Sequence, residues 1–480
     1  MKKRILSVLS LILAIALAFS CAACGKDSEP TTDVGGNDDF FTDTEVEVST
    51  EETTDASQAQ TGNTQQSGST STPQGGSQTG AVTVGGKSWA EVKKSIPAKL
   101  KGSTVEIVNW NPASEYAGAS EAIKKFTKET GIKVKWTVID YSVYFTKLAS
   151  RVATDTAPDV CRTRTPNIMT LQNFQPISTS GYDFSDAAWD QLTMKHYTVN
   201  GKAYATCLKG THIATPQMIF YNRDAIKKYD LEDPYKLWKA GKWTWDKLLE
   251  MGETFRKVSG NESAIASSNY DPFLPFFGVQ GPVEYDGTKY YSVIKTEKYL
   301  KVMQTITNLH TGTHFMEHGN SGNFDSGNIL FSLGTTIYAR RKNAWYSSLK
   351  SSGSLGTVPF PTISGQPYIQ GMGEYEAYAI AKGAKNAVAV PYFLRYYLDP
   401  ANYDMKSFFV DNQALEVHNW CMSQTNTSWP TYNGGIADYQ DAFGGMFNTP
   451  SDQVKNFIDS NAAVIDTRVK TYNETIAKLK

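Results

Sequence analysis

An alternation of strand-like and helix-like segments restricts the possible folds more than any other feature of this sequence. Apolar or alternating residues at 105–110, 132–139 and 159–161 predict strands. Between them, 121–130 and 144–153 carry apolar residues at helical spacing and predict amphipathic helices. This order is typical of an α/β fold, in which helices flank a parallel sheet. Ligands of such sheets bind beyond the carboxyl ends of the strands.

Length and charge set further limits. The chain has 480 residues, of which 40% are hydrophobic and 12% aromatic. This is enough for a large core, and the length suggests two or three domains. The formal net charge of −1 gives no basic excess, so we expect no nucleic-acid partner. Acidic residues outnumber basic ones between 25 and 86, which leaves the remainder mildly basic and compatible with neutral or somewhat acidic solutes.

Residues 1–24 have the pattern of a secretory leader. Basic residues at 2–4 precede an apolar run at 5–19, which is short for a membrane span. Small residues then precede Cys24, and the segment resembles a bacterial lipoprotein signal. That resemblance implies that Cys24 is lipidated, with Cys21 as the alternative and an ordinary cleaved signal without lipid as a third. We expect the protein on the extracytoplasmic face of a bacterial cell membrane.

The stretch at 25–86 consists mainly of Ser, Thr, Gln, Gly and Asp. It cannot bury enough apolar surface to offset the entropy of ordering, so we predict a disordered tether. A flexible chain of this length spans roughly 40 Å, which suits a globule held off a membrane.

Three cysteines, Cys161, Cys207 and Cys421, fall in the predicted folded part. An odd and sparse set is not a disulfide framework. We expect three small buried side chains, although one pair such as Cys161 with Cys207 is open.

Several short segments along the chain match one known pattern in order and spacing. They include VEIVNW at 105–110, the run 122–136, KLASRVATDTAPDV at 147–160, FYNRD at 220–224, WTWDKL at 243–248, the segment 334–345 and YAIAKGAKN at 378–386. Together they resemble the family 1 extracellular solute-binding proteins, the maltodextrin-binding type and its sugar-binding relatives. Ala339, Arg340 and Arg341 depart from the pattern, which commonly has small residues there.

The resemblance implies a type II periplasmic-binding-protein-like fold with two α/β lobes and a ligand cleft between them. The expected lobes are 87–213 with 374–425, and 214–373 with 426–480. The chain would cross between them near 214–221 and 368–378. Ligand bound to both lobes would favour the closed state.

The function implied is that of the substrate-binding subunit of an ABC importer, which captures a mono- or oligosaccharide and delivers it to a membrane permease. We expect a monomer that is not an enzyme, without cofactor or metal. Two alternatives use the same fold: capture of a non-sugar solute, and a surface sensor or adhesin.

A sugar offers apolar faces to aromatic rings, and hydroxyl groups to carboxylates, amides and guanidinium groups. Position along the resembling segments selects the candidates, with Trp345 foremost; for each of them a packing or surface role is the alternative. Asp159, Asn222 and Asp224 are expected to be structural turn and cap residues. The candidate ligand-binding residues are Trp110, Asn111, Glu115, Arg164, Asp271, Phe273, Trp345, Tyr375, Trp420 and Trp429.

A histidine cluster supports a different and weaker hypothesis. His314, Glu317 and His318 spell H-x-x-E-H, the inverted zinc-protease signature, which would place two ligands on one helix face. His310 continues the same spacing. Glycines on both sides disfavour a long helix here, and no paired downstream helix supplies a third ligand. A zinc-dependent hydrolase is therefore the least favoured function.

Overall fold

The computed structural model describes residues 85–116, 118–164, 168–211, 214–267, 272–286, 288–318, 322–373, 376–428 and 444–479. All of them belong to one compact unit, 44–480. The predicted leader, nearly all of the predicted tether and Cys24 lie outside the described residues.

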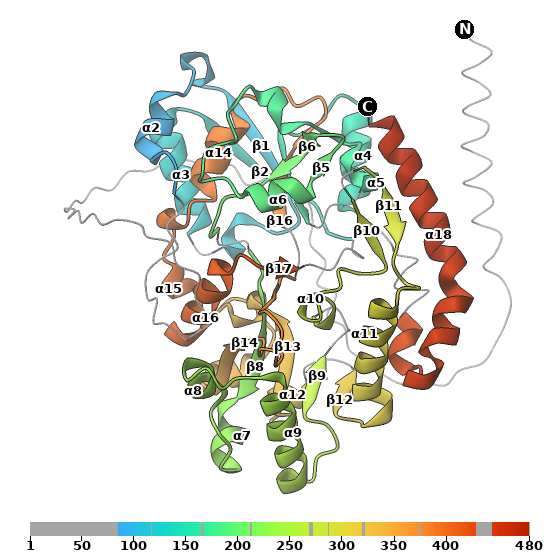
Figure 1. The fold of residues 1–480 in the computed structure, drawn as a ribbon. Helices are drawn as coiled ribbons and strands as arrows, with labels where there is room; N and C mark the ends of the chain where they lie inside the picture. The colour runs from blue at the N-terminus through green and yellow to red at the C-terminus, as the bar shows by residue number, and fades with distance from the viewer. Residues whose placement is uncertain are drawn as a thin grey trace, which may run out of the picture. The chain divides into compact units, whose positions relative to one another are not determined.

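The first sheet contains the strands predicted from the N-terminal alternation. Its order is β2-β1-β3-β16-β4, with β7 also paired to β16. Figure 1 labels β1, β2 and β16 of this sheet. β1 is parallel to β2 and β3, as predicted, whereas β16 is antiparallel to β3. The strands are β1 (Thr104–Asn109), β2 (Lys133–Val138), β3 (Val160–Arg164), β4 (Phe174–Gln175), β7 (Ala205–Thr206) and β16 (Glu376–Ala381).

The helices of this sheet follow local sequence signals. α3 (Ala119–Thr130) buries Ala122 and Phe126 and ends at Gly131, whose φ of 73° is the left-handed conformation that glycine adopts at helix ends. α4 (Tyr144–Ala153) has the predicted bounds. α14 (Val390–Tyr397) packs against α3 and α2 (Trp89–Lys94), with Phe393 and Phe126 in contact.

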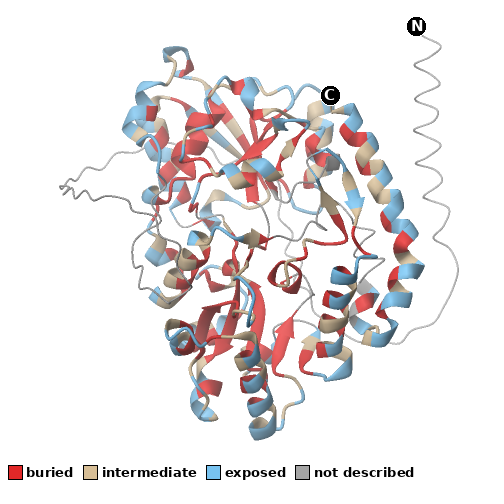
Figure 2. Ribbon diagram, in the orientation of Figure 1, coloured by how far each residue is buried: buried red, intermediate tan, exposed pale blue. Residues whose placement is uncertain are grey.

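The second sheet has the order β12-β9-β13-β8-β14. Its central strand β8 is buried at all six positions, as expected for a strand covered on both faces. It pairs antiparallel with both β13 and β14. Figure 2 shows these strands as buried and the surrounding helices as exposed on one side. The strands are β8 (Gln217–Asn222), β9 (Ile265–Ser267), β12 (Met316–His318), β13 (Phe331–Thr335) and β14 (Leu355–Pro359).

Caps fix where the helices of this half begin. The Asn222 side chain accepts hydrogen bonds from the first turn of α7, which confirms its predicted structural role. Thr244 caps α9 in the same way, at the start predicted from the WTWDKL segment. The helices are α7 (Arg223–Lys228), α8 (Pro234–Lys239), α9 (Trp245–Ser259), α11 (Glu297–Thr307), α12 (Gly322–Asp325), α13 (Ser347–Ser352), α15 (Met405–Phe408) and α16 (Asn412–Ser423).

Two neighbouring segments connect the sheets. Pro216 and Met372 form an antiparallel bridge, and the Gly373 N–H donates to the Thr215 carbonyl at 2.8 Å. The chain then passes through β16, after which α16 packs against β14 of the second sheet. This helix lies within 374–425, a range that the sequence assigned to the first lobe. The division into the two predicted lobes stays a prediction.

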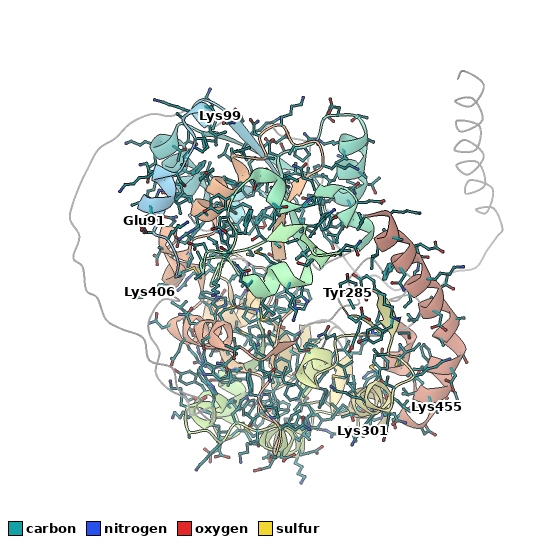
Figure 3. All side chains as sticks on the ribbon, turned by 45° about the horizontal axis from the view of Figure 1, so that its top comes forward. Glu91, Lys99, Tyr285, Lys301, Lys406 and Lys455 are labelled. Carbon is teal, nitrogen blue, oxygen red and sulfur yellow. The ribbon has the colours of Figure 1, made fainter. Side chains whose placement is uncertain are left out.

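A long C-terminal helix, α18 (Val454–Lys478), contacts elements of both halves. It packs against α11 and β11 and against α5 (Ile168–Leu171). β11 (Tyr290–Ser292) forms a hairpin with β10 (Val283–Tyr285), and Figure 3 labels Tyr285 on it and Lys455 on α18. Among the helices of the described ranges, none has both the length and the apolar character needed to cross a membrane.

The remaining described elements are short. The strands are β5 (Thr198–Val199), β6 (Lys202–Ala203), β15 (Gln370–Gly371) and β17 (Thr427–Ser428), and the helices are α6 (Gln191–His196) and α10 (Phe273–Phe276). Single helical turns of other types lie at Ala98–Leu100, Ala113–Glu115, Ile177–Ser180, Asn308–Gly312, Thr336–Ala339, Pro400–Asn402, Gly444–Asn448 and Ser451–Gln453.

A buried histidine holds α16 against the second sheet. His418 Nδ1 lies 3.2 Å from the Thr336 hydroxyl, and its ring centroid lies 4.9 Å from that of Phe409. Burial, together with the nearby positive charge of Arg340, lowers the pKa of His418 from 6.5 to about 3. The His418 ring is therefore uncharged in the folded protein at neutral pH.

A buried carboxylate joins the first sheet to the turn after β16. Asp159 Oδ2 accepts from the Glu106 N–H of β1 at 2.9 Å, and Oδ1 accepts from the Asn386 N–H at 2.7 Å. Both contacts are structural, in agreement with the role predicted for Asp159.

We expect Asp159→Asn to lower the free energy of unfolding by about 1–3 kcal/mol, because the new amide group turns a donor toward one of the two backbone N–H groups. Urea unfolding of the purified protein measures this. Glu121→Gln, at an exposed position of α3, is the control and should change stability by less than about 0.5 kcal/mol. An equal effect of both substitutions would contradict the structural role of Asp159.

The buried His418 should make the folded protein less stable in acid. Because the pKa of His418 falls from 6.5 to about 3 on folding, the unfolded chain binds a proton between these values that the folded protein does not. Stability therefore falls as the pH falls from 6.5 toward 3. His418→Gln should reduce this dependence by at most about 1.4 kcal/mol per pH unit. Urea unfolding at a series of pH values tests it, and an unchanged slope would refute the assignment.

Candidate functional site

The edges of the two sheets that carry the crossing segments also carry the polar residues. β1 and β3 end at the edge where β16 begins, since Glu376 pairs with Arg164. In the second sheet, β13 ends where β8 begins, since Thr335 pairs with Gln217. The crossing segments lead directly into β8 and β16, so these two edges lie on either side of the crossing. This is the region in which we place the candidate site.

A buried ion pair forms the centre of the first edge. Arg162 of β3 is 3% exposed, and its guanidinium donates to the Glu376 carboxylate and to the Tyr116 hydroxyl. It also donates to Asn109 Oδ1 at 3.3 Å. Its Cζ atom lies 4.2 Å from the ring centroid of Trp110, in cation–π geometry. The side chain thus fixes groups from β1, β3, β16 and the loop after β1.

Electrostatics in this network extend to the second edge. Burial disfavours the charge of Arg162, but the Glu376 carboxylate together with the hydroxyl groups of Tyr116 and Tyr378 outweighs this effect, and the pKa of Arg162 is raised. Arg340 follows the turn at Thr336–Ala339, and burial lowers its pKa to about 10, with Arg162 contributing in the same direction. The Arg340 guanidinium donates to the Ala214 carbonyl in the crossing segment at 3.2 Å. Arginines from both sheets therefore influence each other through this region.

One direct hydrogen bond joins the loops of the two edges. Lys342, in the loop after Arg340, donates from Nζ to the Ser114 carbonyl at 2.8 Å. Ser114 belongs to the turn that follows β1, so a loop of the second sheet touches a loop of the first. The two edges are in contact in this structure.

Aromatic rings lie at both edges. Trp110 packs edge-on against Tyr144 and Tyr141, with ring centroids 5.2 and 5.4 Å apart. Tyr141 follows β2 and is 47% exposed. Tyr141 is not among the candidates selected from the sequence, although it has the same signal as Trp110, an aromatic residue just beyond the carboxyl end of a strand.

Trp345 is the exposed ring of the second edge. It stacks on Tyr338, with centroids 4.9 Å apart and planes inclined by 16°, and is 37% exposed. Tyr338 in turn contacts Phe220 of β8 and the buried Tyr346. One face of Trp345 is therefore backed by the core of its own half.

The other predicted site residues fall into three groups. Asn111 donates its backbone N–H to Asn109 Oδ1, and Glu115 is exposed on the following turn, so both lie near Trp110. Phe273 is fully buried beside Trp245. Trp420 packs between Trp238 and Tyr368. The Phe273 ring therefore has a packing role, whereas Trp420 is only partly buried and its ligand role stays a prediction. Asp271, Tyr375, Trp429 and the side chain of Arg164 lie outside the described residues and stay predictions.

The histidine cluster does not form the helix face that the H-x-x-E-H pattern would require. His314 has a positive φ of 52°, and Glu317 and His318 lie in β12, which pairs with β9. His310 instead lies in a π-helical turn after α11. Strand pairing, which local spacing does not reveal, overrides the pattern here. Within the described ranges, no group of three His, Cys, Asp or Glu residues is placed to hold a metal ion.

The cysteines behave as small buried side chains. Cys161, Cys207 and Cys421 are all buried and free in the structure, so the Cys161–Cys207 pair that the sequence left open is not formed. Burial raises the pKa of all three thiols, which keeps them protonated and unreactive.

Comparisons with known proteins agree with this geometry. Residues 109–404 match the family model of the bacterial extracellular solute-binding proteins. No curated protein matches the chain.

Among solved structures, the GacH receptor of Streptomyces glaucescens is similar over 78% of this chain and 99% of its own, with a TM-score of 0.53 and 16% identity. The sugar-binding protein MalE of Xanthomonas citri covers 78% and 98%, with a TM-score of 0.56 and 16% identity. The galacto-N-biose-/lacto-N-biose I-binding protein of Bifidobacterium longum covers 77% and 98%, with a TM-score of 0.53 and 17% identity. At these identities the likeness shows the fold, which is the predicted two-lobed fold of periplasmic binding proteins. The chain therefore belongs to the family of bacterial extracellular solute-binding proteins.

Proposed function

We propose that this protein is the lipid-anchored, extracytoplasmic substrate-binding subunit of an ABC importer. It captures a mono- or oligosaccharide between the two sheet edges and delivers it to a membrane permease. The observation that carries the proposal is the Trp345 ring, which is partly exposed and stacks on Tyr338, and whose loop touches the opposite edge through Lys342.

The residue types at the two edges suit a carbohydrate. A pyranose presents apolar C–H faces that pack on aromatic rings, and Trp345 offers such a ring from the second sheet. Trp110 and Tyr141 offer rings from the first. Asn111 and Glu115, in the loop after β1, supply groups that can bond sugar hydroxyls. Tyr141 thus joins Trp110, Asn111, Glu115 and Trp345 in the proposed site.

The crossing segments place one sheet edge on each side of the proposed ligand. A ligand that contacts both edges binds the closed state more tightly than the open one and so shifts the population toward closure. The Lys342–Ser114 hydrogen bond joins the loops of the two edges and would be lost if these loops moved apart. The permease then recognises the closed form, and the protein itself performs no catalysis.

The solved relatives support the carbohydrate class. The GacH receptor was solved with acarbose, and a cyclo/maltodextrin-binding protein of the same fold was solved with maltotetraose. The predicted leader, tether and Cys24 support the lipid anchor. The alternatives that keep the fold are a non-sugar solute and a sensor or adhesin role. The zinc-dependent hydrolase hypothesis required His314 and His318 on one helix face, and the structure does not place them on one.

A thermal-shift screen of the purified protein against sugars, sugar phosphates, uronates, polyamines, peptides and zinc tests the proposal. A ligand at a hundred times its dissociation constant adds about 2.7 kcal/mol to the stability of the folded state. A shift with one sugar class supports carbohydrate capture. A shift only with a polyamine or peptide moves the function to the non-sugar alternative.

Trp345→Ala should weaken binding of the sugar found in that screen by at least about tenfold, or about 1.4 kcal/mol, because the stacking surface is lost. Isothermal titration calorimetry measures the dissociation constant. Tyr291→Ala is the matched control, because Tyr291 on β11 is equally exposed and lies outside the proposed site. Unchanged binding by the Trp345 variant would remove this residue from the site.

A further inference from the structure

We propose that Lys350 is a positioning residue that holds the Trp345 ring in place and thereby sets ligand affinity. The proposal rests on the proposed function for its effect on affinity. Its structural part, the control of Trp345 by Lys350, stands on the contacts of the loop 340–346 alone.

The loop 340–346 carries both Lys342 and Trp345 and has no helix or strand beyond an isolated bridge between its first residue, Arg340, and Phe409. A ring on a loop binds a flat ligand well only when its backbone is fixed beforehand, since otherwise binding must order it. The stacking of Trp345 on Tyr338 fixes the plane of the ring. The backbone of the loop must be fixed by contacts other than this stacking.

Lys350 ties the loop to α13. Its Nζ donates to the carbonyl of Arg340 at 3.0 Å and to the carbonyl of Asn343 at 2.8 Å. These two carbonyls lie at the start and in the middle of the loop. Hydrogen bonds from a charged donor are stronger than neutral ones, so one side chain closes the loop against the helix that follows it.

A further hydrogen bond connects Asn343 with Trp345. The Trp345 N–H donates to Asn343 Oδ1 at 2.9 Å, and the Asn343 N–H donates to the Arg340 carbonyl at 3.2 Å. Lys350 thus holds the carbonyl of Asn343, and the side chain of Asn343 holds the backbone of Trp345. Two consecutive hydrogen bonds connect the ammonium group with the residue that carries the exposed ring.

The far end of the loop is held independently. Tyr346 has a φ of 59°, which is unfavourable for a residue with a side chain. Its buried hydroxyl lies 2.7 Å from the Ser332 hydroxyl of β13. Asp325 accepts from the N–H groups of Ser348 and Leu349 and so fixes the start of α13. Lys350 therefore acts from a helix that is itself anchored.

The ammonium group of Lys350 is partly withdrawn from water, which is unfavourable for a charged group. This agrees with a specific role in holding the loop. Burial lowers the pKa of its amine to about 8, although the carboxylate of Asp325 works in the opposite direction. A lysine on a helix surface ordinarily keeps its ammonium group in water. Here the group faces two carbonyls of the same loop instead.

The first test is spectroscopic and needs no ligand. The difference in near-UV circular dichroism between the wild type and Trp345→Phe gives the signal of the Trp345–Tyr338 stack. Lys350→Met, which keeps the aliphatic stem, should lose at least about half of this signal, and Lys350→Arg should restore part of it. Lys301→Met on the exposed surface of α11 is the control and should retain it. Retention of the full signal by Lys350→Met overturns the proposal.

A second variant protects the test against misfolding. Asn343→Ala breaks the same path without touching Lys350, and it should lose the same signal. If Lys350→Met does not fold, the other two variants decide. Full signal in Asn343→Ala overturns the proposal. Loss of the signal in Asn343→Ala together with its retention in Lys350→Arg supports it.

The affinity arm uses maltotetraose as the probe and calorimetry as the measurement. We expect Lys350→Met to weaken binding about fivefold in the wild-type background and to have no further effect in Trp345→Ala, because it acts through that ring. Equal losses in both backgrounds overturn the positioning role. If the wild type binds neither maltotetraose nor any other sugar, the proposed function fails, whereas the dichroism still decides the role of Lys350.

Discussion

The buried pair of Arg162 and Glu376 is the interaction on which the candidate site depends. Two charges withdrawn from water are costly unless their remaining hydrogen-bonding groups are satisfied, and breaking such a pair leaves one charge uncompensated. Here the guanidinium also reaches Tyr116 and Asn109 and lies over Trp110. Glu376 is the first residue of β16, directly after the chain has crossed back from the second sheet. The pair therefore fixes the point at which the crossing segment enters the first sheet.

The side chains of the two edges are held in place in different ways. On the first edge the side chains belong to strand ends and are held by the sheet. On the second edge they belong to a loop, which is supported by the hydrogen bond that Lys350 donates to the Asn343 carbonyl and by the one that the Asn343 side chain accepts from the Trp345 N–H. Arg340 links the two, because it begins that loop and donates to the carbonyl of Ala214 in the crossing segment.

Local patterns predicted much of the first half. The bounds of α4 and the end of α3 at Gly131 follow from helical spacing and a glycine at the helix end, which are properties of adjacent residues. The caps at Asn222 and Thr244 have the same local origin. The motif series predicted the family, which the match over 109–404 confirms.

Most of the features that the sequence did not predict depend on contacts between residues far apart in the chain. Arg162 and Glu376 are 214 residues apart, and no spacing rule relates them. The stretch around His314 was a possible zinc-binding helix, but its end pairs as a strand with β9. Phe273 was selected by its place in a motif, whereas packing against Trp245 buries it completely. Tyr141 was missed although the rule that selected Trp110 applies to it equally.

Hydrogen–deuterium exchange with and without a saturating sugar tests the central claim most directly, because it reports on both edges in one measurement. The account predicts that the ligand slows exchange at 109–116 and at 335–346 together, since both segments close on it. Slowing at only one of these segments, or only around 310–318, would contradict capture between the two sheets.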